Sequence, residues 1–352
     1  MKTEMLDSIV KAILYEGYIL YPYRSSALKN RQRWNFGVLY PESYCATQKG
    51  AEANALRTEC LLLGDVRTQL EIAVRFLHPL MREVGKSDPR EEDRYEIVDA
   101  LEVDGRVFYT WQEAVERSVH LAPEALSAWL KAPRTTLFSF PPSRQIEYIR
   151  DRMNRKVGAL VRRQSAINGA VEVSLERLDE KTFKATVRVE NLTSFDVARG
   201  ASRDEALLCS FVSTHIILGL RGGEFVSLLE PPEELRAQAA SCHNEGVWPV
   251  LVGEPGARDL VLASPIILYD YPQVAPESAG DLFDGTEIDE LLSLRILTLT
   301  DDEKREARAV DERARALLER VEGMPAEQLL KLHGAVREMR PIGNEEATEE
   351  RR

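Results

Sequence analysis

Residues 168–193 carry the pattern that most constrains the fold, because two alternating runs flank a short charged turn. In each run an apolar side chain occupies every second position, and residues 179–181 between the runs are all charged. A strand with this period of two buries one face and leaves the other in water. The segment therefore predicts an antiparallel hairpin of the kind found in sandwiches and open sheets. The alternating apolar residues are Val171, Val173 and Leu175, then Phe183, Ala185, Val187 and Val189.

Other segments have the composition of strands. Residues 69–80 keep a period near two, and residues 95–109 predict two strands joined at Asp104-Gly105, a pair that readily takes the positive φ angles of a tight turn. Residues 206–220 and 259–272 are more continuously apolar, as expected of strands that are buried on both faces.

Helical spacing occurs in fewer places. It predicts helices over residues 3–15, 111–133 and 231–241. The strongest helix signal covers residues 300–322, where Thr300 and Glu303 form a capping box and Gly323 and Pro325 end the helix. A second helix over residues 326–339 would complete a hairpin, and the polar tail from residue 343 onward is expected to be disordered. The helix predicted over residues 300–322 has a stripe of small apolar residues along one face: Ala307, Val310, Ala314, Leu317 and Val321.

Together these signals predict an α+β fold, with a mainly antiparallel β body and a C-terminal helical hairpin. At 352 residues the chain exceeds one ordinary small core. The expected division is an N-terminal α+β domain (1–160), a β-rich, sandwich-like domain (161–299), a helical hairpin (300–340) and a disordered tail (341–352). The hairpin is expected to be semi-independent and to serve association, with a homodimer as the simplest case.

Charge and cysteine content limit the expected partners and the expected cellular compartment of the protein. The formal net charge of −12 disfavours nucleic acid as a partner at the level of the whole molecule. Charged residues interrupt the N-terminal 20 residues, so neither an export signal nor a membrane span is expected there. The four cysteines are scattered, without a C-x-x-C pair, which favours free thiols in a reducing compartment, by default the cytoplasm.

A basic run lies among aromatic residues near the N-terminus. It contains Arg24, Lys29, Arg31 and Arg33 without an acid, and Tyr18, Tyr21, Tyr23 and Trp34 flank it. Such a run can neutralise phosphates and stack on bases, can bind an acidic protein, or can form a solvated loop. We assign its four cations and Trp34 as candidate partner-binding residues.

An acidic segment of opposite charge occupies residues 276–290. Six acids and no base lie within it, but their spacing does not fit a calcium-binding loop. The segment is therefore expected to be a solvated loop or to pair with the basic run within the chain. Its candidate partner-binding residues are Asp281, Asp284, Glu287 and Asp289.

Catalytic and metal signatures are weak. Cys242-His243 is the one adjacent pair of soft ligands, but no second pair completes the four ligands that structural zinc prefers. The sequence lacks the G-x-S-x-G motif of hydrolases and the glycine-rich phosphate-binding motifs. We therefore predict no cofactor and no metal, while distant histidines converging on a cysteine would still allow an enzyme.

Two runs, residues 13–34 and 264–315, resemble an uncharacterised bacterial family whose genes lie beside those of high-affinity, actinobacterial-type [NiFe] uptake hydrogenases. They make up about a fifth of the chain and carry no catalytic residue that could be transferred. The resemblance implies an accessory or maturation role for a [NiFe] hydrogenase, and it implies no mechanism.

Three functions from different classes follow. The leading hypothesis is a non-catalytic accessory protein that binds a protein partner, possibly a hydrogenase subunit. The alternative is a hydrolase-type enzyme with a pocket between the β-rich halves, using Cys242 or His243. The third is a nucleic-acid-binding regulator that uses the basic run.

Overall fold

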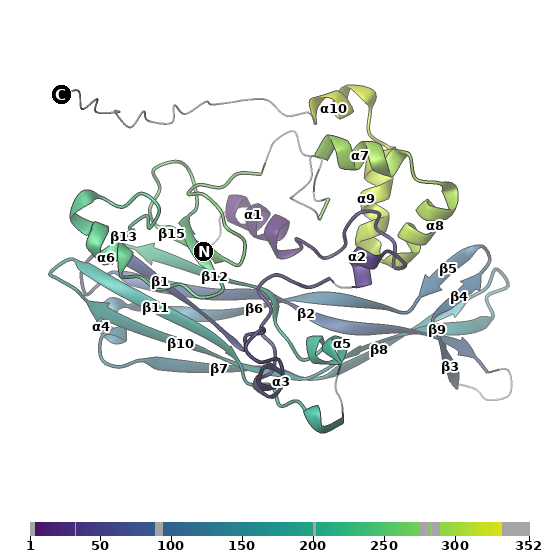
Figure 1. Cartoon of the computed structure of the whole chain (residues 1–352), viewed down its shortest axis with the longest axis horizontal. Coiled ribbons are helices and arrows are strands. Elements are labelled where there is room, and N and C mark those ends of the chain that lie inside the picture. The colour runs from purple at the N-terminus through teal and green to yellow at the C-terminus, as the bar shows by residue number, and fades with distance from the viewer. Residues whose placement is uncertain are drawn as a thin grey trace, which may run out of the picture.

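Two antiparallel sheets and one layer of helices form the protein (Figure 1). The structure is a computed structural model that describes residues 4–31, 33–88, 94–199, 202–274, 280, 282–283 and 289–332. The α+β class with a mainly antiparallel β body is confirmed. Residues 333–352, which include the end of the predicted second helix and the predicted disordered tail, lie outside the described residues.

The smaller sheet contains the hairpin that the alternating pattern predicts. Val173 on one strand lies opposite Val187 on the next, and the pairing continues without interruption from residues 169 and 191 to the turn. The five strands of this sheet, in spatial order, are β13 (Glu224–Phe225), β1 (Ala55–Leu63), β11 (Thr182–Asn191), β10 (Ile167–Arg177) and β7 (Arg134–Phe140).

The larger sheet is built around β2 (Gln69–Ser87), a strand of 19 residues that has different neighbours at its two ends. One edge pairs with β6 (Trp111–Ala125) and then with β3 (Tyr95–Val98). The other edge pairs first with β12 (Val212–Arg221) and then with β9 (Lys156–Gln164). Further strands extend the sheet at its two sides: β15 (Leu260–Ser264) and β14 (Trp248–Leu251) beyond β12, and β8 (Ser143–Arg150) beyond β9.

Residues 111–133 are mostly strand, so the predicted helix there is wrong. Only α4 (Leu126–Trp129) is helical. The rest forms β6, which pairs along β2 with, for example, Val119 opposite Val74 and Leu121 opposite Ile72. Intrinsic helix preference is worth less than one kcal/mol per residue, roughly, and pairing with a long neighbouring strand overrides it.

The predicted turn at Asp104-Gly105 is confirmed. It joins β4 (Ala100–Val103) to β5 (Arg106–Tyr109), and both turn residues have positive φ angles, 52° and 82°. This two-stranded hairpin is a projection inserted between β3 and β6. Its residues Leu101 and Phe108 pack on Leu160 and Val84 of the larger sheet.

The sandwich core lies between the two sheets and contains a large cluster of buried apolar side chains. Phe76 of β2 stacks on Phe211 with ring centroids 4.7 Å apart. Both sheets combine strands from either side of residue 160, because β1 pairs with β11 and β2 pairs with β12. The predicted boundary between residues 160 and 161 falls inside β9, and each of the two large sheets contains strands from both sides of it.

Helices cover the outer face of the larger sheet (Figure 1). At one end, Ile9 and Val10 of α1 (Glu4–Leu14) pack on Ile217 and Leu262. At the other end lie the C-terminal helices, which pack together with the aromatic N-terminal segment on Leu77, Trp111 and Ala114. These helices are α7 (Asp289–Leu297), α8 (Asp301–Val310), α9 (Glu312–Glu322) and α10 (Ala326–Lys331).

The C-terminal helical hairpin is present, but it turns at a different residue from the predicted one. Thr300 and Glu303 form the expected capping box of α8. The helix then ends at Asp311, which has extended backbone angles and caps α9 by accepting from the Ala314 amide at 2.8 Å. The whole predicted stripe is buried in the core shared with the N-terminal segment. Residues 300–332 therefore share a core with the N-terminal segment and the larger sheet, and their role in association stays a prediction.

Candidate functional site

The first half of the basic run contacts α8. Arg24 pairs with Glu303 at 3.2 Å, and the backbone amide of Ser26 donates to Glu306 at 3.0 Å. Lys29 lies exposed on the short helix α2 (Leu28–Arg31). Arg31 ends the same helix, and its side chain is not described. Among the described residues, the acid that pairs with Arg24 comes from α8, and pairing of the basic run with the acidic segment stays a prediction.

Arg33 and Trp34 lie beneath the surface, which corrects their assignment as residues of an exposed partner-binding surface. Arg33 is only 4% exposed. Its guanidinium donates to the carbonyl oxygens of Tyr18, at 2.9 Å, and Gln112, and it lies 3.8 Å from the ring centroid of Trp111. The Trp34 indole donates to the Gln112 side chain at 3.1 Å. Both residues tie the N-terminal segment to the start of β6.

The acidic candidates are mostly not described. Asp281, Asp284 and Glu287 lie outside the described residues, so their assignment stays a prediction. Asp289 is the first residue of α7 and is half-buried.

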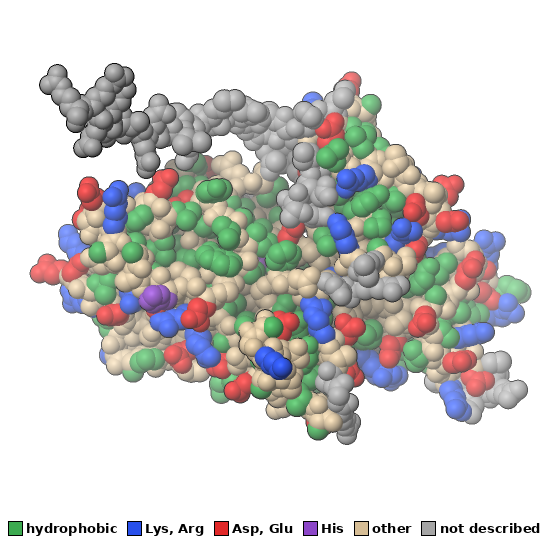
Figure 2. All heavy atoms as spheres, in the orientation of Figure 1, with side chains coloured by type: hydrophobic (Ala, Val, Ile, Leu, Met, Phe, Trp, Pro, Cys, Tyr) green, Lys and Arg blue, Asp and Glu red, His purple; other side chains and the backbone are tan. Residues whose placement is uncertain are grey.

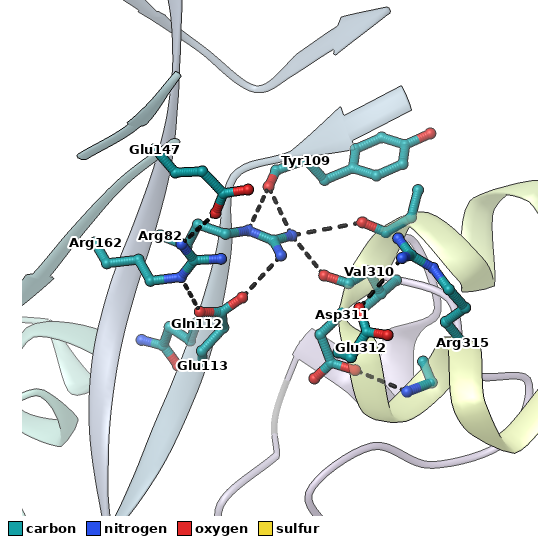
Figure 3. Close-up of polar contacts among 12 residues, drawn as sticks. Arg82, Tyr109, Gln112, Glu113, Glu147, Arg162, Val310, Asp311, Glu312 and Arg315 are labelled. Atoms are coloured by element: carbon teal, nitrogen blue, oxygen red, sulfur yellow. Dashed lines mark hydrogen bonds and ion pairs between the residues drawn. The ribbon is translucent and has the colours of Figure 1, made fainter. Parts of the chain in front are cut away.

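A network of charged side chains connects α8 to the larger sheet (Figure 3). The sequence analysis did not predict it. Glu113 accepts from Arg82 and from Arg162, each at 2.8 Å, and Arg162 also donates to Glu147 at 2.9 Å. Arg82 additionally donates to the carbonyl oxygens of Tyr109 and of Val310, the last residue of α8. A cation at this position satisfies carbonyl groups that the helix leaves unpaired and opposes its dipole.

Cys242 and His243 lie beside a buried carboxylate. The backbone amide of His243 donates to Glu59 at 2.8 Å, while its side chain is exposed. Burial tends to raise the pKa of Glu59, but the His243 amide and the Arg57 guanidinium together lower it below its ordinary value. An adjoining cleft of about 400 Å³ is lined in part by Glu59, Lys184 and Trp129.

The thiol of Cys242 lacks the properties of a catalytic nucleophile. Burial, and then the negative charge of Glu59, raise the pKa of Cys242 to about 11. Catalytic cysteines have a lowered pKa and a thiolate near neutral pH. The geometry therefore gives the hydrolase alternative no activated nucleophile at this position.

An exposed apolar segment follows β15. The sequence predicts a buried strand over residues 259–272, but the strand ends at Ser264, and Ile267 and Tyr269 are 73% and 86% exposed. The side chains on either side of Tyr269 are held: Leu268 packs against the cluster beneath α1, and Asp270 accepts from the Leu251 amide at 2.7 Å.

A second contact brings another exposed residue to this segment. Asp270 also accepts from the Ser227 hydroxyl at 2.5 Å, and the same hydroxyl accepts from the amide of Leu229, whose side chain is half exposed. We call Leu229, Ile267 and Tyr269 the Tyr269 patch. Figure 2 shows hydrophobic side chains gathered on the part of the face that contains β13 and β15. Exposed apolar groups on a fixed backbone are a common feature of interaction surfaces.

The described residues contain neither a membrane-spanning helix nor a cluster of metal ligands. None of their helices has the length and apolar character to cross a bilayer. Their histidine, cysteine and acidic side chains nowhere gather in the groups of three or more that hold a metal ion.

No family model matches the chain, and no curated protein matches its sequence.

Proposed function

We propose that this protein is a non-catalytic accessory factor that binds another protein through the Tyr269 patch. The observation that carries the proposal is the exposure of Tyr269 and Ile267 on a backbone that Asp270 holds in place. Fixed aromatic and aliphatic side chains lose little conformational freedom on binding, so their burial contributes efficiently to affinity.

The acidic segment of the sequence suggests the chemistry of the partner. Residues 276–290 come after the patch residues in the sequence and contain six acids and no base. A partner that suits both features has an apolar pocket for Tyr269 with lysine or arginine at its rim, because complementary charge raises association rates and discriminates between partners. Asp281, Asp284, Glu287 and Asp289 belong to the proposed surface on this reasoning.

The resemblance supplies a specific partner to test. The patch residues Ile267 and Tyr269 fall inside the longer of the two runs that resemble the hydrogenase-associated family. We therefore propose a [NiFe] hydrogenase subunit as the partner and assembly of that enzyme as the role. All four cysteines are free thiols, which supports the cytoplasm as the place where this happens.

The test is the affinity for a purified [NiFe] hydrogenase large subunit from the same organism, measured by biolayer interferometry. Tyr269→Ser and Ile267→Ser should each weaken binding by about tenfold or more, as truncation of an interface hot spot does. Their thermal midpoints should match the parent, since both side chains are exposed.

The matched control is Leu137→Ser. Leu137 is 72% exposed on β7 of the smaller sheet, so this variant removes a similar exposed side chain elsewhere. If the parent does not bind the subunit, the proposed partner is wrong. If Leu137→Ser and Tyr269→Ser weaken binding equally, the patch is not the contact surface.

A further inference from the structure

A cleft of about 330 Å³ lies between the N-terminal segment, the start of β6 and the short helix α5 (Arg203–Leu207). It shares no residue with the Tyr269 patch. Its volume falls at the lower end of the range for small-molecule sites. The residues that decide its chemistry are Arg33, Trp34, Met81, Trp111, Arg203 and Asp204.

Two arginines of this cleft have only neutral hydrogen-bond acceptors among the described residues. Arg33 donates to two backbone carbonyl groups, and Arg203 donates to the carbonyl groups of Arg33 and Trp34 and to the side chain of Asn35. Two carboxylates act on Arg33 without pairing with it: the buried Asp311, which caps α9, and Glu113, which is shared between two other arginines.

Buried Arg33 therefore makes no direct ion pair in the described part of the chain, and the carboxylates of Asp311 and Glu113 compensate its charge only in part. Burial lowers the pKa of Arg33 to about 10, so at neutral pH the guanidinium still carries its charge. A buried charge without a counter-ion is costly, and that cost falls when an anion occupies the adjoining space. The exposed Asp204 is the acid among the residues that line the cleft.

A second, independent observation concerns Trp111. Its side chain is only 8% exposed, and its indole N–H has no acceptor among the described residues. Indole is a donor only, and buried donors nearly always have a partner. The cleft thus offers two arginine donors and apolar walls from Trp34, Trp111 and Met81, and the unpaired indole N–H belongs to one of these wall residues.

From these observations we infer that the cleft binds a small organic carboxylate with an aromatic or apolar body. The carboxylate lies beside Arg33 and Arg203 and accepts from the Trp111 indole, while the body lies against the tryptophan rings and Met81. Arginine favours carboxylates because its fork of donors matches their two oxygens.

Tryptophan fluorescence tests the inference, because two of the four tryptophans line the cleft. Benzoate is the probe, and acetate and inorganic phosphate are the comparisons at equal ionic strength. We expect a saturable change with benzoate and a much weaker response to the other two anions. Absence of a saturable benzoate response, or a phosphate response at least as strong, overturns the inference.

Substitutions distinguish the effect of a charge in the cleft from the effect of the protein's overall charge. Asp204→Asn removes the acid of the cleft and should tighten benzoate binding several-fold, whereas Arg203→Gln should weaken it by about tenfold. The control Glu254→Gln makes the same charge change as Asp204→Asn at an exposed site in the β14–β15 loop and should leave affinity unchanged. Equal affinities for Asp204→Asn and Glu254→Gln would overturn the site assignment, and the aspartate variant should fold because its side chain is exposed.

Discussion

The larger sheet has two cores, one on each face, and they are held together differently. The sandwich core on its inner face is built mainly from aliphatic and phenylalanine side chains, such as the stacked pair Phe76 and Phe211. The helix–sheet core on its outer face encloses Arg33, Arg82 and Asp311 among tyrosines and tryptophans. The same strand, β2, contributes to both.

This difference predicts different tolerance to change. Apolar burial is non-directional, so the sandwich core depends mainly on volume and shape. Buried charges require acceptors in fixed places, and removing one partner leaves the other desolvated and unpaired. The helix–sheet core should therefore be the more sensitive to substitutions that conserve volume.

The largest expected effect comes from a comparison of two substitutions by methionine, one in each core. Arg82→Met should lower the free energy of unfolding by about 3–5 kcal/mol, because it leaves part of Glu113 and the carbonyl groups at the end of α8 unpaired. Leu62→Met in the sandwich core should cost less than about 1.5 kcal/mol. Urea unfolding of both variants measures the difference.

Arg163→Met is the control for arginine loss. Arg163 neighbours Arg162 on β9, but it is about half exposed and pairs with Glu83 on the surface. Its loss should cost less than about 1 kcal/mol. Equal destabilisation by the Arg82 and Arg163 variants would remove the distinction between the two cores.

The pH dependence of stability should come in part from two buried histidines, one on each face of the larger sheet. Burial lowers the pKa of both His78 and His215 to about 4. The unfolded chain, with an ordinary value near 6.5, binds these protons first as the pH falls. Stability should therefore be nearly complete above about pH 6.5 and decrease from there toward pH 4, by roughly 1.4 kcal/mol per histidine at pH 5.5.

Urea midpoints at pH 7.5 and 5.5 measure this loss. His78→Leu and His215→Leu should each remove about half of the pH dependence, because the leucine cannot take up a proton. If neither variant changes the pH dependence, the two histidines are not its source.

The sandwich core could be predicted from sequence, and the helix–sheet core could not. Alternation at Val171 to Val189 identifies a half-buried hairpin without knowledge of its partner. Arg33, in contrast, belongs to a run of basic residues, and its acceptor Gln112 lies 79 positions away. Nothing local to Arg33 reveals this distant acceptor.

The Tyr269 patch escaped prediction for a related reason. Composition makes residues 259–272 one continuous apolar segment, yet the strand stops at Ser264, just before Pro265. A proline has no amide hydrogen to continue a strand ladder, so Pro265 was the signal that separates the buried part from the exposed part. The helical reading of residues 111–133 failed because a distant strand, β2, decided the outcome.

The smallest effect is expected at the other end of the basic run. Arg24 and Glu303 are each a little over a quarter exposed, so water screens their attraction. Arg24→Gln should change the free energy of unfolding by less than about 1 kcal/mol, a typical value for a surface ion pair. Arg33→Gln, nine positions later, should be markedly more destabilising, because its cation contacts two carbonyl groups and two tryptophan rings in the buried core.

Urea unfolding of both variants at two salt concentrations checks this difference between Arg24 and Arg33. The small Arg24 effect should fade at high salt, while the Arg33 effect should persist, since buried contacts are poorly screened. A large, salt-resistant loss at Arg24 would instead place it among the residues that hold the helix–sheet core together.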